Sequence, residues 1–272
     1  MSFEHLTHPM VTHENWDQFT TQEHAVWQIL FNRQNILLKN RTPQEVLDGM
    51  AKLDLCESKI PKLSDLNKIL RKTTRFSLVP VKGFIPEDLF FKFLSNRQFP
   101  VGCFIRKPNQ LDYLEEPDIF HDVFGHIPLL TNPIFADFME SFGHKGLEAI
   151  DLDLVKFAGA LYWFTVEFGL IMTPQGIRIY GAGITSSKGE SIYALESNFP
   201  KRISFNPLRA MKTKYHIDSF QKTYFVIHSF QQLFETLKNL NWLEIKGFCQ
   251  TFPDVDEGIL INGEEKIHDS TF

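Results

Sequence analysis

The sequence predicts a mainly α-helical protein with a few short β-strands, arranged as a single compact domain. Apolar side chains recur at helical spacing along much of the chain, and several of these stretches begin with a pattern typical of a helix start. Runs that are rich in β-branched and aromatic residues are few and short. The 272 residues contain no internal repeat and no low-complexity linker, so one large domain accounts for them.

The first half of the chain is expected to hold a loose N-terminal arm, four helices and two strands. Residues 1–15 are rich in His and Thr and lack periodicity, so we expect them to form the arm and residues 16–272 the domain. Thr42 to Glu45 match a capping box, and Ser64 is a candidate N-cap. The expected helices cover residues 23–38, 43–53, 64–72 and 86–96, and the expected strands cover residues 75–81 and 99–106.

The second half is expected to contain four further helices, at residues 133–142, 153–172, 187–197 and 229–241, a strand at 177–180, and turns or a hairpin at 254–258. Gly181-Ala182-Gly183 predicts a passage where the backbone closely approaches another group. Ser187 and Glu190 form a second capping-box pattern. This pattern gives Glu190 a structural explanation that requires no catalytic role.

Two histidines, His121 and His126, stand five residues apart in an apolar stretch where Pro117 and Asp118 indicate a helix start. On a regular α-helix they would lie about 140° apart around the axis, which is poor for binding one metal ion. The helix must therefore end or loosen near Gly125 if both imidazoles are to bind the same ion. The alternative is two buried histidines, each hydrogen-bonded to a carbonyl group.

The candidate third ligand is Glu167, which lies in a stretch that is apolar on both helical faces and therefore predicts a buried helix. That stretch is too short for a membrane span. From residue 158 to 172, the phenol of Tyr162 is the only other ionisable group. A buried carboxylate must be paired, protonated or bound to a metal. A Glu–Arg ion pair and a protonated carboxyl group therefore remain open as alternatives.

Two imidazoles and one carboxylate are the ligands of non-haem Fe(II) sites, in which open positions remain for oxygen, water or substrate. Zinc uses the same ligand types, so a zinc-dependent hydrolase is an alternative. The HExxH pattern of zinc proteases is missing, because Asp122 follows His121 and the second histidine is one residue too far along.

Composition bounds the function further. Hydrophobic residues make up 43% and charged residues 22%, as in an ordinary globular protein. The net charge of −5 and the absence of a basic run exclude nucleic acid as an expected partner, and no membrane partner is expected. The three cysteines are far apart, which is typical of reduced thiols in a cytoplasmic protein. The first residues show no signal-peptide pattern.

Three motifs together resemble the catalytic core of the tetrahydropterin-dependent aromatic amino acid hydroxylases, and in particular their bacterial single-domain phenylalanine 4-hydroxylases. They are PDIFHDVFGHIP from Pro117, LYWFTVEFGL from Leu161 and IYGAGITSSKGE from Ile179. The likeness extends from about Trp27 to about Phe252. It implies the fold of that catalytic domain for this chain.

The resemblance also implies roles for individual residues. His121, His126 and Glu167 fall on the iron-ligand positions and are the expected catalytic centre. Arg106 matches the residue that holds the substrate carboxylate. The other expected substrate-binding residues are Pro117, Asp118, Trp163, Phe168 and Ser186. The expected pterin-binding residues are Leu94, Ser95, Phe99, Asp122 and Tyr162; Phe99 matches the ring that stacks on the pterin, and Asp122 replaces a glutamate of the animal members.

By this resemblance the chain would be a phenylalanine 4-monooxygenase that converts L-phenylalanine to L-tyrosine with O2, Fe(II) and a tetrahydropterin. Tryptophan or tyrosine hydroxylation is the alternative within the family, and a non-catalytic pterin- or metal-binding protein is another outside it. The animal members carry a regulatory domain and a C-terminal helical extension that assembles tetramers. Because neither is seen here, the resemblance implies a monomer or dimer rather than a tetramer.

Overall fold

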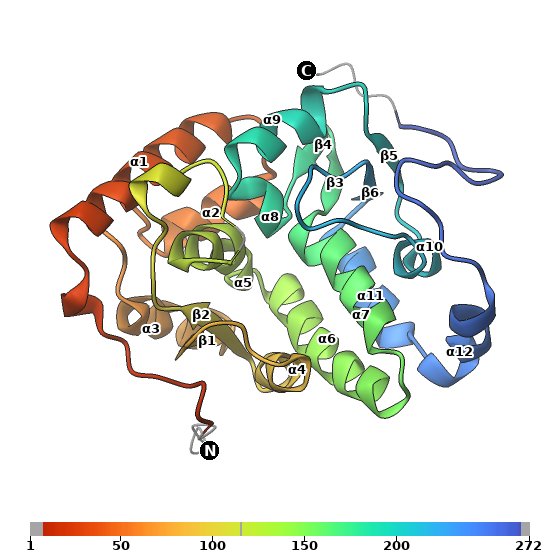
Figure 1. Cartoon of the computed structure of the whole chain (residues 1–272), viewed down its shortest axis with the longest axis horizontal. Helices are drawn as coiled ribbons and strands as arrows, with labels where there is room; N and C mark the ends of the chain where they lie inside the picture. Colours follow the sequence, from red (N-terminus) through yellow and green to blue (C-terminus); the bar gives the residue numbers. More distant parts are fainter. Residues whose placement is uncertain (1–7, 115, 268–272) are drawn as a thin grey trace.

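Two consecutive helices, α6 (Pro133–Asp151) and α7 (Val155–Tyr162), run through the middle of the molecule, and the other elements pack around them (Figure 1). This computed structural model describes residues 8–114 and 116–267. Helix α6 packs against helices on both sides, while α7 packs against α6 and α10. The predicted fold class, mainly helical with short strands, is confirmed. Among the described residues, no helix is long and apolar enough to cross a membrane.

The first half of the chain wraps one side of α6. Its elements are the 3-10 helix Trp16–Gln18, α1 (Thr21–Leu37), α2 (Gln44–Lys52), α3 (Leu63–Thr73), β1 (Ser77–Val81), α4 (Glu87–Ser95), β2 (Gln98–Gly102) and the 3-10 helix Pro108–Gln110. Strands β1 and β2 form a parallel pair in which Ser77 is opposite Gln98. Helix α4 connects them and lies on α6.

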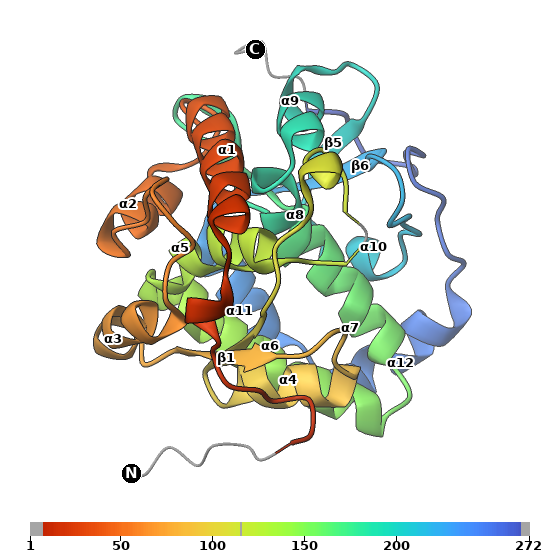
Figure 2. The ribbon, with the colours of Figure 1, turned by 60° about the vertical axis from the view of Figure 1, so that its left-hand side comes forward.

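The second half adds a four-stranded sheet and the remaining helices. In order along the chain, they are α5 (Ile127–Leu130), α6, α7, β3 (Leu170–Thr173), β4 (Gly176–Ile179), α8 (Ala182–Thr185), α9 (Lys188–Glu196), β5 (Lys201–Ser204), α10 (Pro207–Met211), β6 (Thr223–Ile227), α11 (Phe230–Asn239) and α12 (Trp242–Thr251). The strand order is β4-β3-β6-β5; β3 and β4 are antiparallel, and β6 is parallel to both β3 and β5. Figure 2 shows α9 beside α1, which it contacts.

Aromatic side chains fill the core beneath the histidine stretch. The ring of Trp27 on α1 meets Phe120 edge-on at 5.4 Å, and Phe31 meets Phe124 edge-on at 5.5 Å. Phe120 and Phe124 stack on each other at 4.8 Å. All four side chains are buried. This packing fixes the inner face of the histidine stretch against α1, so the opposite face is the one that carries the site.

The predicted helix ranges of the first half are close to those observed, but two of the predicted caps are wrong. The capping box at Thr42 does not form, because the hydroxyl of Thr42 bonds the carbonyl of Leu38 and helix α2 begins without a side-chain cap. Ser64 is not an N-cap either. Helix α3 begins one residue earlier, and the carboxylate of Glu14 accepts from the backbone N–H groups of Leu63 and Ser64 instead.

Several predicted lengths are also wrong. The helix expected over 153–172 begins at Val155 and loses its helical hydrogen bonding after Glu167, and residues 170–173 form β3. The β-branched residues there pair in the sheet, which overrides the apolar periodicity. Helix α6 continues nine residues beyond its expected end at Phe142, to Asp151. The expected strands at 75–81 and 99–106 are both shortened, to five residues each.

The N-terminal arm lies partly outside the described residues, which begin at residue 8. Residues 8–15 pack against the domain. Val11 forms an antiparallel bridge with Val81 of β1, and the N–H of Thr12 bonds the carbonyl of Pro80 at 2.9 Å. At the other end of the chain, Val255 bridges Thr213, and the described residues up to 267 form no terminal hairpin.

Candidate active site and metal centre

A wider helix brings His121 and His126 to the same face despite their spacing of five residues. Residues His121–His126 form a π-helical segment, which is followed directly by α5. In a π-helix the hydrogen bonds join residues five apart, so residues i and i+5 lie on the same face. The Nε2 atoms of the two histidines are consequently only 3.2 Å apart. The predicted loosening of the helix is therefore observed, although it spans the whole segment rather than only Gly125.

A second π-helical segment, Trp163–Glu167, extends α7 and carries the third candidate ligand. The Glu167 carboxylate lies 3.2 Å from Nε2 of His126 and 3.6 Å from Nε2 of His121. One ligand atom from each of the three side chains lies within 4.8 Å of the others. The first π-helical segment begins and ends at a candidate ligand, and the second ends at one. Together they bring three candidate metal ligands close to one point.

The electrostatics of this cluster fit a bound cation. Burial lowers the pKa of His121 to about 4, so its imidazole is neutral. Burial opposes ionisation of Glu167, but the two histidines outweigh it and lower the pKa of this carboxyl group. The neutral imidazole of His121 and the imidazole of His126 therefore face a carboxylate at close range. Among the described residues, no Lys or Arg pairs with Glu167, which removes the expected alternative of a Glu–Arg ion pair.

Gly181 keeps the loop before α8 close to the third ligand. A Cβ atom at this position would lie 2.3 Å from the carbonyl oxygen of Glu167, so only glycine fits. The close approach predicted for the Gly-Ala-Gly sequence is confirmed. It brings α8, and with it Ser186 at the end of that helix, alongside the histidine segment, which α8 contacts.

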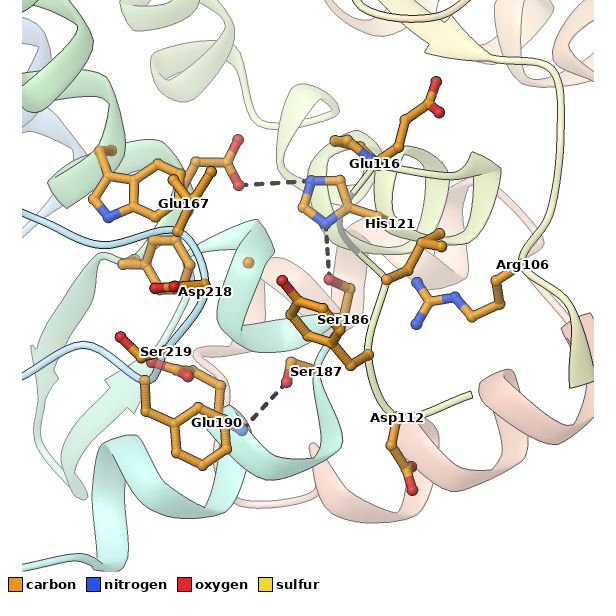
Figure 3. A pocket seen from close by; sticks show the side chains of 18 of the residues that line it. Arg106, Asp112, Glu116, His121, Glu167, Ser186, Ser187, Glu190, Asp218 and Ser219 are labelled. Carbon is orange, nitrogen blue, oxygen red and sulfur yellow. Dashed lines mark hydrogen bonds and ion pairs between the residues drawn. The ribbon is translucent and has the colours of Figure 1, made fainter. Parts of the chain in front are cut away.

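Ser186 orients the first histidine. Its hydroxyl donates its one hydrogen to the carbonyl of Ala182 at 2.7 Å, and it lies 2.9 Å from Nδ1 of His121 (Figure 3). Because the hydroxyl hydrogen is already used, Nδ1 must be the donor in the second bond. The lone pair of His121 is then on Nε2, the atom that faces His126 and Glu167. Partners of this kind fix the tautomer and ring direction of metal-binding histidines.

Arg106 and Asp118 form a buried pair near the cluster. The carboxylate of Asp118 accepts from Nε and Nη2 of Arg106, both at 2.8 Å, and from the backbone N–H of Arg106. It also accepts from the N–H of His121 at 3.0 Å, as a helix cap would. Burial raises the pKa of Asp118, but these bonds and the charge of Arg106 outweigh it, so the pKa is lowered overall. Asp118 is fully buried and holds Arg106 in place.

A large cavity of about 580 Å³ opens on one side of the three ligands. Its lining includes Arg106, Pro117, Trp163, Phe168 and Ser186, all of which the sequence predicts as substrate-binding residues. The rings of Trp163 and Phe168 lie 4.6 Å apart and form an aromatic wall. The structure therefore brings together every predicted substrate residue except Asp118, which lies behind Arg106.

A smaller cavity of about 210 Å³ lies on the other side. It shares His121 and Glu167 with the large cavity, so the ligand cluster stands between the two. The predicted pterin residues Phe99, Asp122 and Tyr162 line it, whereas Leu94 and Ser95 do not. Leu94 and Ser95 end helix α4 and pack closely against Gly143 of α6.

Phe99 lines the small cavity but presents little surface to it. Its side chain is only 2% exposed, and its ring lies 4.8 Å from that of His126. Phe90, which sequence reasoning missed, also lines the small cavity and is half-buried. Its ring meets Tyr162 edge-on at 5.2 Å. The spacing of residues in α4 gives no signal that singles out Phe90 from its aromatic neighbours.

Asp122 turns towards the small cavity. Its carboxylate accepts from the backbone N–H of Gly102 at 2.8 Å, which ties it to the end of β2. Burial raises the pKa of Asp122 to about 7. Burial likewise raises the pKa of the Tyr162 phenol well above its usual range, so this group stays protonated.

Glu190 differs from its sequence interpretation. The hydroxyl of Ser187 caps α9 by accepting from the N–H of Glu190 at 3.3 Å, but the reciprocal half of the capping box is missing. The carboxylate of Glu190 instead accepts from the Tyr224 hydroxyl and from the N–H of Gln221. Burial raises the pKa of Glu190 to about 7. Glu190 also lines the large cavity.

Comparison with known proteins agrees with this geometry. The profile of the biopterin-dependent aromatic amino acid hydroxylases matches residues 13–263. The chain belongs to this family. The resemblance drawn from the three sequence motifs is therefore confirmed, and with it the expectation of an iron- and pterin-dependent oxidoreductase.

Curated bacterial hydroxylases of the family are close in sequence. The chain is 46% identical to the phenylalanine-4-hydroxylase of Ralstonia nicotianae over 254 residues, which cover 93% of this chain and 81% of the relative. It is 51% identical to the phenylalanine-4-hydroxylase of Chromobacterium violaceum over 219 residues, which cover 80% of this chain and 74% of the relative.

Solved structures of the Chromobacterium violaceum phenylalanine hydroxylase share the fold. One with bound Fe(III) gives a TM-score of 0.92 at 44% identity and covers 95% of this chain and 94% of that one. Another holds iron(III) and the oxidised cofactor 7,8-dihydrobiopterin, with a TM-score of 0.89, 44% identity and coverage of 95% and 93%. The hydroxylase fold therefore accommodates an iron and a pterin together, and His121, His126 and Glu167 of this chain could bind the metal.

Proposed function

We propose that this hydroxylase is a phenylalanine 4-monooxygenase, which converts L-phenylalanine, O2 and a tetrahydropterin into L-tyrosine and a 4a-hydroxypterin. One oxygen atom of O2 enters the aromatic ring, and the other stays on the pterin. The observation that carries the proposal is the position of the two-histidine, one-carboxylate cluster between two cavities. Identity of 46–51% with bacterial phenylalanine-4-hydroxylases supports the choice of substrate.

The large cavity suits an aromatic amino acid. Arg106 lies at its wall, where Nε and Nη2 donate to Asp118 and Nη1 donates to the carbonyl of Leu111 at 3.4 Å. One N–H on Nη1 and one on Nη2 remain for a substrate carboxylate. Trp163 and Phe168 offer an apolar surface to the ring. Holding the carboxylate at one end and the ring at the other presents a ring carbon to the metal position, which is a gain in orientation.

The small cavity suits the pterin. We assign the aromatic contact with the pterin ring to Phe90, because Phe99 is buried against His126 and has little free surface. Asp122 and Tyr162 would complete this side. Fe(II) held by His121, His126 and Glu167, together with the tetrahydropterin, would supply oxygen activation and two electrons when bound.

The residues of the chain place these groups and need not transfer a proton to begin the reaction. Ser186 keeps the Nε2 lone pair of His121 directed at the cluster. The aromatic wall removes water from the face of the cluster that the substrate ring approaches. We assign no general base.

An aerobic assay with Fe(II), L-phenylalanine and a synthetic tetrahydropterin tests the proposal, with tyrosine followed by chromatography. The expected result is tyrosine that requires both iron and pterin. Oxidation of the pterin without tyrosine would overturn the choice of substrate and leave L-tryptophan or L-tyrosine. If neither occurred, the proposal would fail; zinc found in the isolated protein would then favour a hydrolase, and binding without turnover would favour a non-catalytic protein.

Two further expectations stay predictions. We propose a cytoplasmic location, which is supported by the three free cysteine thiols. We also propose a monomer or dimer, on the resemblance to bacterial single-domain members. Light scattering on the purified chain gives its mass directly, and a tetramer would contradict the second expectation.

A further inference from the structure

One amide side chain behind the aromatic wall of the large cavity uses all of its hydrogen-bonding groups. Gln221 is 1% exposed and precedes β6. Its Oε1 accepts from Nε1–H of Trp163 at 2.9 Å. Its Nε2 donates to the carbonyl oxygens of His216 at 2.9 Å and Ser219 at 3.2 Å. Because the indole only donates and the two carbonyls only accept, the amide has a single possible orientation.

The partners of this amide belong to two parts of the same cavity. Trp163 forms the wall and is also stacked on Tyr215, at 4.6 Å between ring centroids. The segment 216–220 forms the mouth, where Ile217 and Phe220 line the cavity. These two side chains are 66% and 46% exposed, so the mouth segment has little core packing of its own.

The amide is itself anchored to the rigid part of the fold. The backbone N–H of Gln221 donates to the Glu190 carboxylate at 3.1 Å, and the hydroxyl of Tyr224 donates to the same oxygen. Tyr224 lies in β6, in the interior of the four-stranded sheet, and Glu190 lies in α9. The amide therefore connects a fixed frame to the wall on one side and to the exposed mouth segment on the other.

We propose that Gln221 is a positioning residue that holds the Trp163 indole and the 216–220 segment together as one wall of the substrate cavity. It sets the plane against which the substrate ring rests, and it keeps the mouth closed to water once the substrate has entered. The proposal rests on the assignment of the large cavity to the aromatic amino acid substrate. Gln221 does not touch the reacting atoms, so its effect is on fit and on the efficiency with which pterin oxidation produces tyrosine.

Two substitutions separate the two connections. Gln221→Met keeps the length of the side chain and removes both the acceptor and the donors. Gln221→Glu keeps an acceptor for the indole and removes the two N–H donors that hold the mouth segment. Matched controls are Gln28→Met and Gln28→Glu, because Gln28 lies exposed on α1 away from the cavity.

Three measurements on the full chain are compared. The first is tyrosine formed per tetrahydropterin oxidised in the iron-loaded enzyme. The second is KM for L-phenylalanine against KM for the pterin. The third needs neither iron nor turnover: the rate of tryptic cleavage after Lys214, an exposed residue next to the mouth segment, with and without L-phenylalanine.

For Gln221→Met we expect less tyrosine per pterin, a KM for L-phenylalanine raised on the order of tenfold, and an unchanged KM for the pterin. Both Gln221 variants should be cut faster after Lys214, and L-phenylalanine should protect them less than it protects the controls. Gln221→Glu should affect the cleavage rate more than the fit of the ring.

The proposal is overturned if the folded variants keep the parent ratio of tyrosine to pterin and the parent KM for L-phenylalanine, whatever their melting temperature. Equal rates of cleavage after Lys214 in the Gln221 variants and the Gln28 controls would also overturn it. If Gln221→Met fails to fold, the cleavage test can still be made on Gln221→Glu, which changes the fewest atoms. Failure of the proposed function is distinct, because the parent enzyme itself would then form no tyrosine from L-phenylalanine.

Discussion

The hydroxyl of Ser186 accepts the Nδ1 hydrogen of His121 at 2.9 Å, because its own hydrogen is given to the carbonyl of Ala182. This relationship leads to the first prediction. Ser186→Ala should weaken iron binding by about 10–100-fold, since the imidazole loses the partner that fixes its tautomer. Iron titration of the apoprotein measures this effect. Ser64→Ala, at an exposed position, is the control, and equal iron affinity in both variants would refute the role of Ser186.

The ligands themselves give the second prediction. His121→Ala, His126→Ala and Glu167→Ala should each abolish hydroxylation while the far-ultraviolet circular dichroism stays that of the parent, because all three side chains lie at the cavities rather than in the aromatic core. Bound iron, measured after desalting, should fall with activity. A variant that lacked iron and still formed tyrosine would show that the ligand assignment is wrong.

The third prediction compares two ion pairs. Asp118→Ala leaves Arg106 charged and only 7% exposed, so unfolding free energy should fall by about 3–5 kcal/mol. Asp112→Ala breaks the pair with Arg33, in which the Asp112 side chain is 73% exposed, and should cost less than about 1 kcal/mol. Urea unfolding at constant pH measures both. Similar losses in the two variants would contradict the buried character of the Arg106–Asp118 pair.

The fourth prediction concerns pH. The pKa of Glu190 is raised by burial from 4.5 to about 7, so the folded chain binds more protons here than the unfolded chain across that window. The contribution of Glu190 to stability must therefore decrease as pH rises from about 4.5 to about 7. Glu190→Gln keeps an acceptor for Tyr224 and Gln221 and should remove this decrease. Melting temperatures of both proteins between pH 5 and 8 test it, and parallel curves would show that Glu190 is not the cause.

The fifth prediction separates two phenylalanines. Phe90→Ala should raise KM for the pterin with a modest loss of stability, because Phe90 is half-buried at the small cavity. Phe99→Ala should instead lower the unfolding free energy by about 3–5 kcal/mol, because its buried ring leaves a void. Pterin kinetics and urea unfolding on both variants decide the matter. A raised KM for the pterin in Phe99→Ala alone would restore the sequence assignment.

The metal cluster was predictable from sequence because its residues are chemically unusual for their surroundings. A carboxylate in an apolar helix and two imidazoles in an apolar stretch need a partner, and the missing partner points to a metal. The five-residue spacing also indicated that the helix must end or loosen near Gly125, although not that it widens along the whole segment. The resemblance assigned Arg106 and Trp163 to the same binding site, and in the structure both line the large cavity.

Other features could not be predicted from the sequence, because they depend on contacts between distant segments. The cap of α3 comes from Glu14, some fifty residues earlier in the chain, so the local pattern favoured Ser64 instead. Apolar periodicity could not show where the helix carrying Glu167 gives way to β3, because both elements are buried. Phe90 and Phe99 look alike in sequence, and only burial distinguishes them.

Because of the two π-helical segments, the geometry of the site depends on the number of residues in each segment as well as on their identity. Each wide turn uses one more residue than an α-helical turn would. Deleting one residue between His121 and His126 would restore an ordinary helix and leave the two imidazoles four apart, still on one face. Because α5 follows His126 directly, it would keep nearly the same direction and its close contact with Gly49 of α2. A deletion inside the segment should therefore disturb the fold less than a one-residue insertion into α5, which would rotate everything after it by about 100° and advance it by about 1.5 Å.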